Sequence, residues 1–347
     1  MTIHPHARSQ TIILTGGTSG LGYACARTIA ASHPDWYLVI ASRNQRQGTQ
    51  AVNTLKHQTG NEQIEWMPLD LASLASVRAF AKDFAARDLP PLHAVICNAG
   101  LQVVSGTTYT QDGFEMTFGV NCLGHFLLVN LLLRHLVAPA RIVFVSSGSH
   151  RPESSSTFMS RVIGTKPPHY RDARALAWPE QYPDAQERHE SPKVVGMRRY
   201  STSKLCDIFY AYELARRLQS QGYSVQEHPI TVNAFDPGPT PGTRLSRDAG
   251  AFGRFAWNVL MPRLRFAMPN MQSLDASGKA LARLVLDPTL EGISGKYFAG
   301  MNERASSQES YDQRKAAELW ETSAELVKLQ SGETILRARN SLEGANS

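Results

Sequence analysis

Short apolar runs alternate with longer segments of helical spacing along most of this chain. Seven of the runs have the length and composition of buried strands, at residues 11–15, 36–41, 62–67, 92–97, 140–146, 229–235 and 295–299. Strands that alternate with helices predict a parallel sheet with helices on both faces. Because crossovers between parallel strands are right-handed almost without exception, the carboxyl ends of the strands share one edge, where ligands bind. The pattern predicts a Rossmann-type doubly wound α/β fold of about seven strands, as a single domain over residues 1–347.

Three segments depart from this alternation. Residues 148–196 lengthen the connection to the next helix and are rich in Pro, Ser, Arg and Glu. Loops of this length are usually functional or disordered, so we expect a pocket wall, with disorder as the alternative. Residues 243–272 mix Phe, Trp and Leu with Arg, which fits an amphipathic substrate lid, an ordinary packing helix or, as a third interpretation, contact with a membrane surface. We expect residues 1–10 and the polar stretch 330–347 to be flexible.

Composition agrees with a soluble, cytoplasmic protein. The net charge of +6 is modest and spread along the chain, so nucleic acid is not an expected partner. No apolar run approaches the roughly 20 residues that span a bilayer, and MTIHPHARSQ lacks the apolar core of a signal peptide. Cys25, Cys97, Cys122 and Cys206 show no CxxC spacing, so we expect reduced core cysteines and no metal site. None of these features encodes the oligomeric state.

A glycine-rich turn follows the first predicted strand. Residues 15–22, TGGTSGLG, lead into the helical stretch YACARTIAAS. Glycines let the backbone turn tightly and approach a pyrophosphate, while the N–H groups and dipole of a helix N-terminus attract its charge. The spacing Gly-x-x-x-Gly-x-Gly differs from the GxGxxG dinucleotide fingerprint, so a flexible turn is an equal alternative for this motif alone.

Tyr200 and Lys204 stand four residues apart in the helical sequence YSTSKLCDIFYAYELARRL, so both side chains emerge from one face of a helix. A phenol with a pKa of about 10 is a poor acid-base catalyst at neutral pH, but a nearby ammonium lowers that pKa toward the working range. The pair is typical of a proton donor and the group that tunes it. Taken alone, the spacing also fits two solvated residues on an exposed face.

Together these features resemble the short-chain dehydrogenase/reductase family. Six family motifs occur in the family's order: TGxxxGxG as residues 15–22, NAG as Asn98-Ala99-Gly100, the helix asparagine as Asn121, the strand-end serine as Ser147, YxxxK as Tyr200 to Lys204, and PG as Pro237-Gly238. The resemblance covers about residues 10 to 300. Within the family the chain is similar to the light-dependent protochlorophyllide reductases and, more loosely, to the retinol dehydrogenases, at residues 112–133 and 295–329.

The resemblance implies a catalytic tetrad. Tyr200 would donate or accept the proton, Lys204 would bind the nicotinamide ribose and lower the pKa of Tyr200, and Ser147 would hydrogen-bond the substrate oxygen. Ser146 is the competing serine, but the family pattern gives this role to the second of the two. Asn121 would position a water that links Lys204 to solvent. The implied cofactor contacts are Gly16, Thr18, Ser19, Gly20, Leu21, Gly22, Arg43, Asp70, Leu71, Asn98, Ala99, Gly100, Tyr200, Lys204, Pro237, Gly238 and Thr240.

The end of the second strand, in WYLVIASRNQRQG, indicates which dinucleotide binds. An acidic residue there usually binds the ribose hydroxyls of NAD, whereas an arginine suits the additional phosphate of NADP. Arg43 stands at that position with no acid nearby, so we predict NADP(H), with Arg43 on the 2′-phosphate; a solvated surface arginine is the alternative. Asp70 matches the family's adenine-contacting aspartate, and capping of a strand end is its alternative.

The expected reaction is transfer of a hydride between NADP(H) and a carbonyl or alcohol carbon of a bulky apolar molecule. Light-dependent reduction of a double bond in protochlorophyllide is the main alternative. The protochlorophyllide reductases carry a cysteine, a second proton-donor candidate, directly after Pro-Gly, and this chain has Pro239 there. Proline has no proton to give, so a thermal reaction is favoured. A non-catalytic NADP(H)-sensing protein is a further alternative, but it has no need of the full tetrad.

Overall fold

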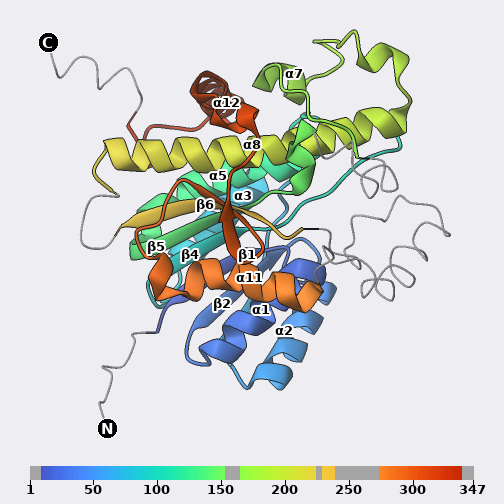
Figure 1. Cartoon of the computed structure of the whole chain (residues 1–347). Coiled ribbons are helices and arrows are strands. Elements are labelled where there is room, and N and C mark those ends of the chain that lie inside the picture. The colour runs from blue at the N-terminus through green and yellow to red at the C-terminus, as the bar shows by residue number, and fades with distance from the viewer. Residues whose placement is uncertain (1–8, 153–164, 224–228, 239–272, 338–347) are drawn as a thin grey trace, which may run out of the picture.

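The computed structural model describes residues 9–152, 165–223, 229–238 and 273–337. Within them, eight strands form one sheet in the order β3-β2-β1-β4-β5-β6-β7-β8 (Figure 1). β1 to β7 run parallel, and β8 pairs antiparallel with β7. The strands are β1 (Thr11–Thr15), β2 (Tyr37–Ser42), β3 (Ile64–Pro68), β4 (Leu92–Cys97), β5 (Leu136–Val145), β6 (Ile230–Asp236), β7 (Lys296–Ala299) and β8 (Asn302–Arg304). The predicted doubly wound α/β fold is confirmed, and the strand order reverses between β1 and β4, where such sheets bind ligands.

Two layers of helices cover the sheet (Figure 1). One face carries α1 (Gly20–Ser32), α2 (Gln45–Thr59) and α11 (Leu274–Leu286). The other carries α3 (Leu74–Ala85), α5 (Gly124–Leu132), α8 (Pro192–Ser220) and α12 (Gln313–Leu326). Shorter elements are α4 (Met116–Phe118), a π-helical turn (Gly119–Leu123), α7 (Ala173–Ala177) and 3-10 turns at Leu133–His135, Gly148–His150, Glu187–His189, Pro288–Leu290 and Gln308–Tyr311.

Successive strand residues alternate between two apolar cores. In β1, Ile13 belongs to the core under α3, α5 and α8, while Ile12 and Leu14 belong to the core under α1 and α11. All three side chains are fully buried, and burial of each contributes roughly 1.5–3 kcal/mol. Because both faces of the sheet are covered, its strands are continuous apolar runs, which made seven of them visible in the sequence.

The segment Met116–His135 corrects one expectation. By length and composition these 20 residues, with a mean hydropathy of 1.6, could cross a membrane, so the expectation that no apolar run approaches this length was wrong. The polar residues Asn121, His125 and Asn130 interrupt the segment, so it does not form one continuous apolar run in the sequence. However, 94% of the segment's most apolar window is buried within the fold. This burial is typical of a core helix covered by its neighbours.

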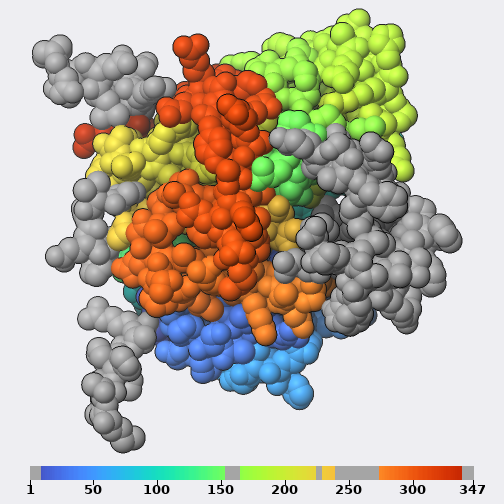
Figure 2. Space-filling view, in the orientation of Figure 1, coloured from blue at the N-terminus to red at the C-terminus, as the bar shows by residue number. Residues whose placement is uncertain are grey.

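Of the predicted insertion 148–196, residues 153–164 lie outside the described residues, and the stretch 165–191 carries α7 and the 3-10 turn Glu187–His189. It forms a protrusion at one end of α8, yellow-green in Figures 1 and 2. α8 itself begins at Pro192, within the segment 148–196 that we predicted as insertion. A proline at the first turn of a helix leaves no unpaired N–H there, which explains this start.

Some predicted segments lie outside the described residues, namely the lid 243–272, Pro239 and Thr240, and residues 1–8 and 338–347. Part of the end that we expected to be flexible is packed. Glu333 pairs with Arg78 at 2.8 Å, the Thr334 hydroxyl donates to the Asn130 side-chain oxygen at 3.1 Å, and Leu336 is 8% exposed. Residues 330–337 are therefore anchored by specific contacts despite their polar sequence.

Candidate active site

The glycine-rich turn links the end of β1 to the start of α1. Gly16 and Gly20 have φ angles of +71° and +59°, which favour glycine. A Cβ at Gly22 would lie 2.5 Å from the Gly16 carbonyl oxygen and 2.5 Å from Asn98 Nδ2, so the backbone is closely packed here. Ser19, the N-cap residue of α1, makes no side-chain capping bond, and the first N–H groups of a helix have no partner within it. The turn therefore fits the pyrophosphate of a dinucleotide.

Thr15 and Asn98 join this turn to the end of β4. The Asn98 side-chain amide donates to the backbone oxygens of Thr15 at 2.8 Å and Gly16 at 3.2 Å. The Thr15 hydroxyl in turn accepts from the backbone N–H groups of Asn98 at 2.9 Å and Ala99 at 3.0 Å. The NAG segment is therefore fixed beside the glycine-rich turn.

Arg43 and Asp70 follow the ends of β2 and β3 at the same edge of the sheet. Arg43 is exposed, as contact with a cofactor phosphate requires. One carboxylate oxygen of Asp70 accepts from the N–H of Ala72 at 3.0 Å, so Asp70 makes the capping bond that we gave as its alternative role. Leu71 is 7% exposed and packs into the core beneath this turn.

The two serines after β5 have different surroundings. Ser146 is 2% exposed, and its hydroxyl donates to the backbone oxygen of Lys204 at 2.7 Å, which ties β5 to α8. Ser147 is half-buried; its side-chain oxygen accepts from the N–H of Ser149 at 3.3 Å, and it lies beside Tyr200, whose pKa it lowers. The geometry therefore favours Ser147 over Ser146 as the partner of a substrate oxygen.

Lys204 is paired with an aspartate that the family motif does not include. Its Nζ donates to the Val145 carbonyl oxygen at 2.9 Å and to Asp207 Oδ2 at 2.9 Å, and lies 5.7 Å from the centroid of the Tyr200 ring. The Lys204 and Asp207 side chains are 6% and 3% exposed, so the ion pair is buried. We did not predict Asp207 as a site residue. Its place three residues after Lys204, on the same helix face, is the signal in the sequence that points to it.

Burial and neighbouring charges set the pKa values of this group. Burial raises the pKa of Tyr200 above its ordinary value; Lys204 lowers it, while Asp207 and Asp236 oppose Lys204. The protein groups alone therefore do not produce the net lowering that we expected. Burial by itself would lower the pKa of Lys204, but Asp207 and Tyr200 raise it, which keeps the ammonium charged. Burial raises the pKa of Asp207 to about 6, against the opposite effect of Lys204.

Asn121 lies in the π-helical turn before α5, a distortion often found at functional sites. Its side-chain oxygen accepts from the N–H of Leu101 at 2.9 Å, and its amide donates to the Leu101 carbonyl oxygen and to Ser203 Oγ, both at 3.0 Å. Asn121 thus joins the segment after NAG to α8. Because its side chain is bonded to protein groups, the positioning of a water by Asn121 stays a prediction.

Gly100 and Gly238 connect the cofactor side to the tetrad side. A Cβ at Gly100 would lie 3.4 Å from Asn121 Oδ1 and 3.6 Å from Lys204 Nζ, so the NAG segment passes directly beside the tetrad. Gly238 follows β6 with a φ angle of +70°, and its N–H donates to Asp236 Oδ1 at 2.8 Å. Asp236 Oδ2 accepts from the Tyr297 hydroxyl at 2.8 Å, so β7 holds the carboxylate in place.

The predicted site residues within the described ranges lie at one edge of the sheet. They occupy the turns that follow β1 to β6, the first turn of α1, the π-helical turn or the first half of α8: Gly16, Thr18, Ser19, Gly20, Leu21, Gly22, Arg43, Asp70, Leu71, Asn98, Ala99, Gly100, Asn121, Ser147, Tyr200, Lys204, Pro237 and Gly238. The four cysteines are free and buried, as expected. In the described ranges no three His, Cys, Asp or Glu side chains group closely enough to hold a metal ion.

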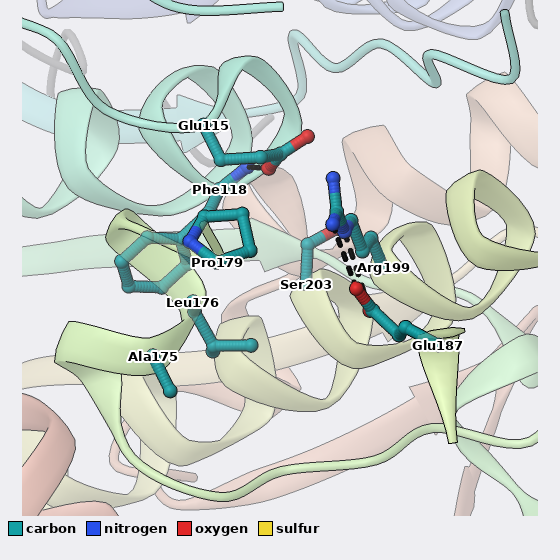
Figure 3. A pocket seen from close by; sticks show the side chains of 8 residues that line it. All are labelled: Glu115, Phe118, Ala175, Leu176, Pro179, Glu187, Arg199 and Ser203. Carbon is teal, nitrogen blue, oxygen red and sulfur yellow. Dashed lines mark hydrogen bonds and ion pairs between the residues drawn. The ribbon is translucent and has the colours of Figure 1, made fainter. Parts of the chain in front are cut away.

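A separate pocket lies under the described part of the insertion (Figure 3). Its lining residues come from α4, α7, α8 and the segments beside them: Glu115, Phe118, Ala175, Leu176, Pro179, Glu187, Arg199 and Ser203. Arg199 pairs with Glu187 at 2.7 Å, and Ser203 accepts the hydrogen bond from Asn121. The described part of the insertion thus lines a small pocket that reaches Ser203 but neither Ser147 nor Tyr200.

Comparison with known proteins places these features in a family. Residues 10–157 match the family model described as short chain dehydrogenase, and residues 245–336 match a model described as AcuH dehydrogenase domain. The chain is 34% identical to the WW domain-containing oxidoreductase of Danio rerio, over 93% of this chain and 69% of that protein. It is 34% identical to retinol dehydrogenase 13 of Homo sapiens, over 93% and 86% of the two chains. It is 32% identical to the polyprenol dehydrogenase of Danio rerio, over 94% and 89%.

A solved structure shares the fold. The blue fluorescent protein from a metagenomic library, in complex with NADPH, superposes with a TM-score of 0.57 at 18% identity, over 86% of this chain and 99% of that one. At this identity the likeness concerns the fold alone. The curated relatives, in contrast, exceed 30% identity over nearly the whole chain. The chain therefore belongs to the short-chain dehydrogenase/reductase family and is an oxidoreductase of the kind that uses a nicotinamide dinucleotide.

Proposed function

We propose that the protein transfers a hydride between NADP(H) and a carbonyl or alcohol carbon of a bulky apolar small molecule, with Tyr200 as the general acid or base. One observation carries this proposal. The Lys204 ammonium, bonded to the end of β5, lies 5.7 Å from the centroid of the Tyr200 ring, and Ser147, two residues after that strand, lies beside Tyr200. Gly100 places the dinucleotide cradle next to this group. When bound there, a nicotinamide dinucleotide supplies or accepts the hydride.

The protein groups handle the proton and the substrate oxygen. Ser147 and Tyr200 can both hydrogen-bond the oxygen on which negative charge develops during carbonyl reduction, and this differential contact lowers the barrier. Tyr200 then gives its proton to that oxygen, or takes one from the alcohol in the reverse direction. The charged Lys204 stabilises the phenolate that Tyr200 becomes. The direction used in the cell is not fixed by this geometry.

Arg43 supports NADP(H) over NAD(H). It is exposed at the end of β2, on the edge where the adenosine half of a dinucleotide lies in doubly wound sheets. A guanidinium there suits the additional phosphate of NADP, since such contacts are charge-assisted and bidentate.

The names of two relatives support an apolar substrate. Retinol dehydrogenase 13 and polyprenol dehydrogenase are both named for long apolar alcohols. The sequence favours the same class of substrate, through the Phe, Trp and Leu residues of the segment 243–272. We further propose that the protein acts in the cytoplasm on such molecules. A fractionation experiment that found it bound to membranes would point instead to the peripheral contact that the same segment allows.

The test combines a substrate panel with one substitution. NADPH oxidation is followed in darkness with bulky apolar aldehydes, ketones and enones, and the active compounds are repeated with Tyr200→Phe. We expect dark turnover by the wild type, and a loss on the order of 10²-fold or more in the variant, because only the transferable proton is removed. NADPH should still bind the variant. Near-normal turnover by Tyr200→Phe would refute the assignment.

A second arm addresses the light-driven alternative. Protochlorophyllide with NADPH is examined by absorption before and after flashes. Chlorophyllide formed only in light, with no dark activity on any carbonyl compound, would refute the conclusion from Pro239 that the reaction is thermal. NADPH binding without turnover in any assay would favour the non-catalytic interpretation.

A further inference from the structure

His125 lies between the cofactor cradle and the tetrad, and none of the family motifs includes it. It is the second residue of α5 and is 2% exposed. Its Nε2 lies 2.9 Å from Thr15 Oγ1, and its Nδ1 lies 3.0 Å from the carbonyl oxygen of Asn121. One imidazole ring therefore contacts both the end of β1 and the π-helical turn.

The partners define which ring nitrogen carries the proton. The Asn121 carbonyl oxygen can only accept, so Nδ1 is the protonated nitrogen and donates to it. Thr15 Oγ1 already accepts from the N–H groups of Asn98 and Ala99, so its own hydrogen is the one to be donated. Neutral Nε2, at 2.9 Å, accepts it better than the Ile96 carbonyl oxygen, at 3.3 Å. The bonds thus run in one direction, from Thr15 through His125 to Asn121.

The same path continues to the catalytic helix. The Asn121 amide donates to Ser203 Oγ at 3.0 Å, and the Ser203 hydroxyl donates to the backbone oxygen of Tyr200 at 2.8 Å. We infer that His125 is a positioning residue that holds the cofactor-binding NAG segment in register with Tyr200, through the hydrogen bonds Thr15–His125–Asn121–Ser203. This inference rests on the proposed function of Tyr200 and names a further residue on which that function depends.

His125 acts in this position as a neutral ring. Burial lowers its pKa to about 4, and the Lys204 charge acts in the same direction against the hydrogen bond to Asn121. At neutral pH the ring is therefore uncharged, and its one hydrogen, on Nδ1, is held in the bond to the Asn121 carbonyl oxygen. His125 therefore acts by holding Thr15 and Asn121 in place through two hydrogen bonds. Displacement of reacting groups by about 1 Å can lower the rate on the order of 10²-fold.

Asn130, five residues after His125, makes a hydrogen bond comparable to the one between His125 and Asn121. The Asn130 side-chain amide donates to the Phe126 carbonyl oxygen, four residues before it, at 2.9 Å. An asparagine on this helix can thus make the bond that His125 makes to Asn121, but it is too short to reach Thr15 as well. His125→Asn therefore keeps the bond to Asn121 and loses the bond to Thr15, and His125→Phe loses both. Asn130→Leu removes the Asn130 bonds to Phe126 and Thr334 from the same helix and leaves all four residues of the path in place.

The first measurement uses hydrogen exchange and needs no substrate. In the wild type and in Asn130→Leu, NADPH should slow amide exchange both at residues 98–101 and at residues 199–204. In His125→Phe and His125→Asn, the slowing should remain at 98–101 and be lost at 199–204. Equal slowing of both segments in the His125 variants would overturn the inference. Thr15→Val breaks the tie from its other end, together with the bonds from Asn98 and Ala99 to Thr15, and should also lose the slowing at 199–204. It covers the case that His125→Phe does not fold.

The second measurement follows the hydride with NADPH deuterated at the transferred position. Misregistered groups should lower kcat on the order of 10²-fold and raise the isotope effect on kcat, because hydride transfer then limits the rate. His125→Asn should behave like His125→Phe, and Asn130→Leu like the wild type. Full activity of His125→Asn would show that only the bond to Asn121 matters and would refute the link to Thr15. Activity retained by Tyr200→Phe would refute the proposed function instead, so the two failures are distinct.

Discussion

The buried ion pair of Lys204 and Asp207 makes two neighbouring residues depend on each other. Removing one partner of such a pair leaves a charge without compensation and costs about 3–5 kcal/mol, whereas replacing both by apolar residues is often neutral. We therefore expect Lys204→Met to lose about 3–5 kcal/mol of unfolding free energy. The double variant Lys204→Met with Asp207→Leu should recover most of it. Urea unfolding of the three proteins at neutral pH measures both effects, and a double variant no more stable than the single one would contradict them.

The pH dependence of Lys204→Met follows from Asp207. The pKa of this carboxyl in the folded protein, about 6, lies above its unfolded value of roughly 3.9, and without Lys204 it is higher still. A group whose pKa is raised on folding contributes stability that is complete below its unfolded pKa and lost as pH rises through its folded pKa. The single variant should therefore regain stability as pH falls from about 8 to about 5, and the double variant should not.

Arg43 provides a test of cofactor choice at the residue scale. A charge-assisted contact contributes about 1.5–3 kcal/mol, so Arg43→Ala should weaken NADPH binding by roughly 10- to 100-fold and leave NADH binding almost unchanged. Fluorescence titration with both cofactors measures this, with Lys56→Ala, at the other end of α2, as the control. Equal loss for both cofactors would show that Arg43 supports the fold, and a wild-type preference for NADH would overturn the choice of NADP(H).

Residue types with a fixed motif spacing were predictable, and residues defined by tertiary contacts were not. Gly16, Asn98, Ser147, Tyr200 and Lys204 were identified from the sequence because each belongs to a motif of the family that the chain resembles. Asp207 and His125 were not predicted because each depends on a tertiary contact. Asp207 pairs with the Lys204 ammonium, which is buried away from water, and His125 contacts Thr15, 110 residues away in the sequence. Spacing from Lys204 and Asn121 hints at both residues but does not identify them.

At the scale of elements, the start of α1 depends on glycine. A methyl group at position 22 would lie 2.5 Å from the Gly16 carbonyl oxygen, so Gly22→Ala must move the turn away from Asn98. We expect a loss of about 1–3 kcal/mol of stability, typical of overpacking, together with a clear loss of NADPH affinity. Thermal unfolding and fluorescence titration measure the two effects. Gly332→Ala, at a position with open space around it, is the control. Unchanged NADPH affinity in Gly22→Ala would show that the cradle lies elsewhere.

The elements that escaped prediction lack an apolar period of their own. β8 has three exposed residues, so nothing in Asn302–Arg304 alternates. It forms because a tight turn returns the chain along β7, where it covers an edge that would otherwise expose unpaired backbone groups. The π-helical turn at Asn121 likewise leaves no trace in the spacing of apolar residues, since it changes only the register of the hydrogen bonds. Parallel strands that are buried on both faces are instead continuous apolar runs, and for this reason β1 to β7 were predicted from the sequence.

At the scale of the whole molecule, the last helix closes the layer that carries the tetrad. α12 crosses α8 and α5, and its Trp320 ring packs edge-on against Phe126 at 4.8 Å between centroids. The Arg217 guanidinium lies 5.0 Å from the same ring, and the hydroxyls of Tyr210 and Ser323 are 2.6 Å apart. A segment more than 100 residues beyond the tetrad thus packs the outer face of its helix, a long-range contact that no local pattern in the sequence predicts.

Trp320→Ala separates the stability of this layer from its chemistry. Removal of a buried tryptophan costs about 3–5 kcal/mol, since the neighbouring rings cannot close the cavity completely. Its contacts on α8 begin ten residues after Tyr200, about 15 Å along the helix, so the tetrad itself should keep its geometry. We therefore expect a lower midpoint in thermal and urea unfolding, with NADPH affinity and turnover at low temperature close to the wild type. Tyr311→Ala, an aromatic side chain that is 53% exposed, is the control. A Trp320→Ala protein that is folded at low temperature but inactive would show that α12 also positions Tyr200, and that the outer layer belongs to the catalytic machinery.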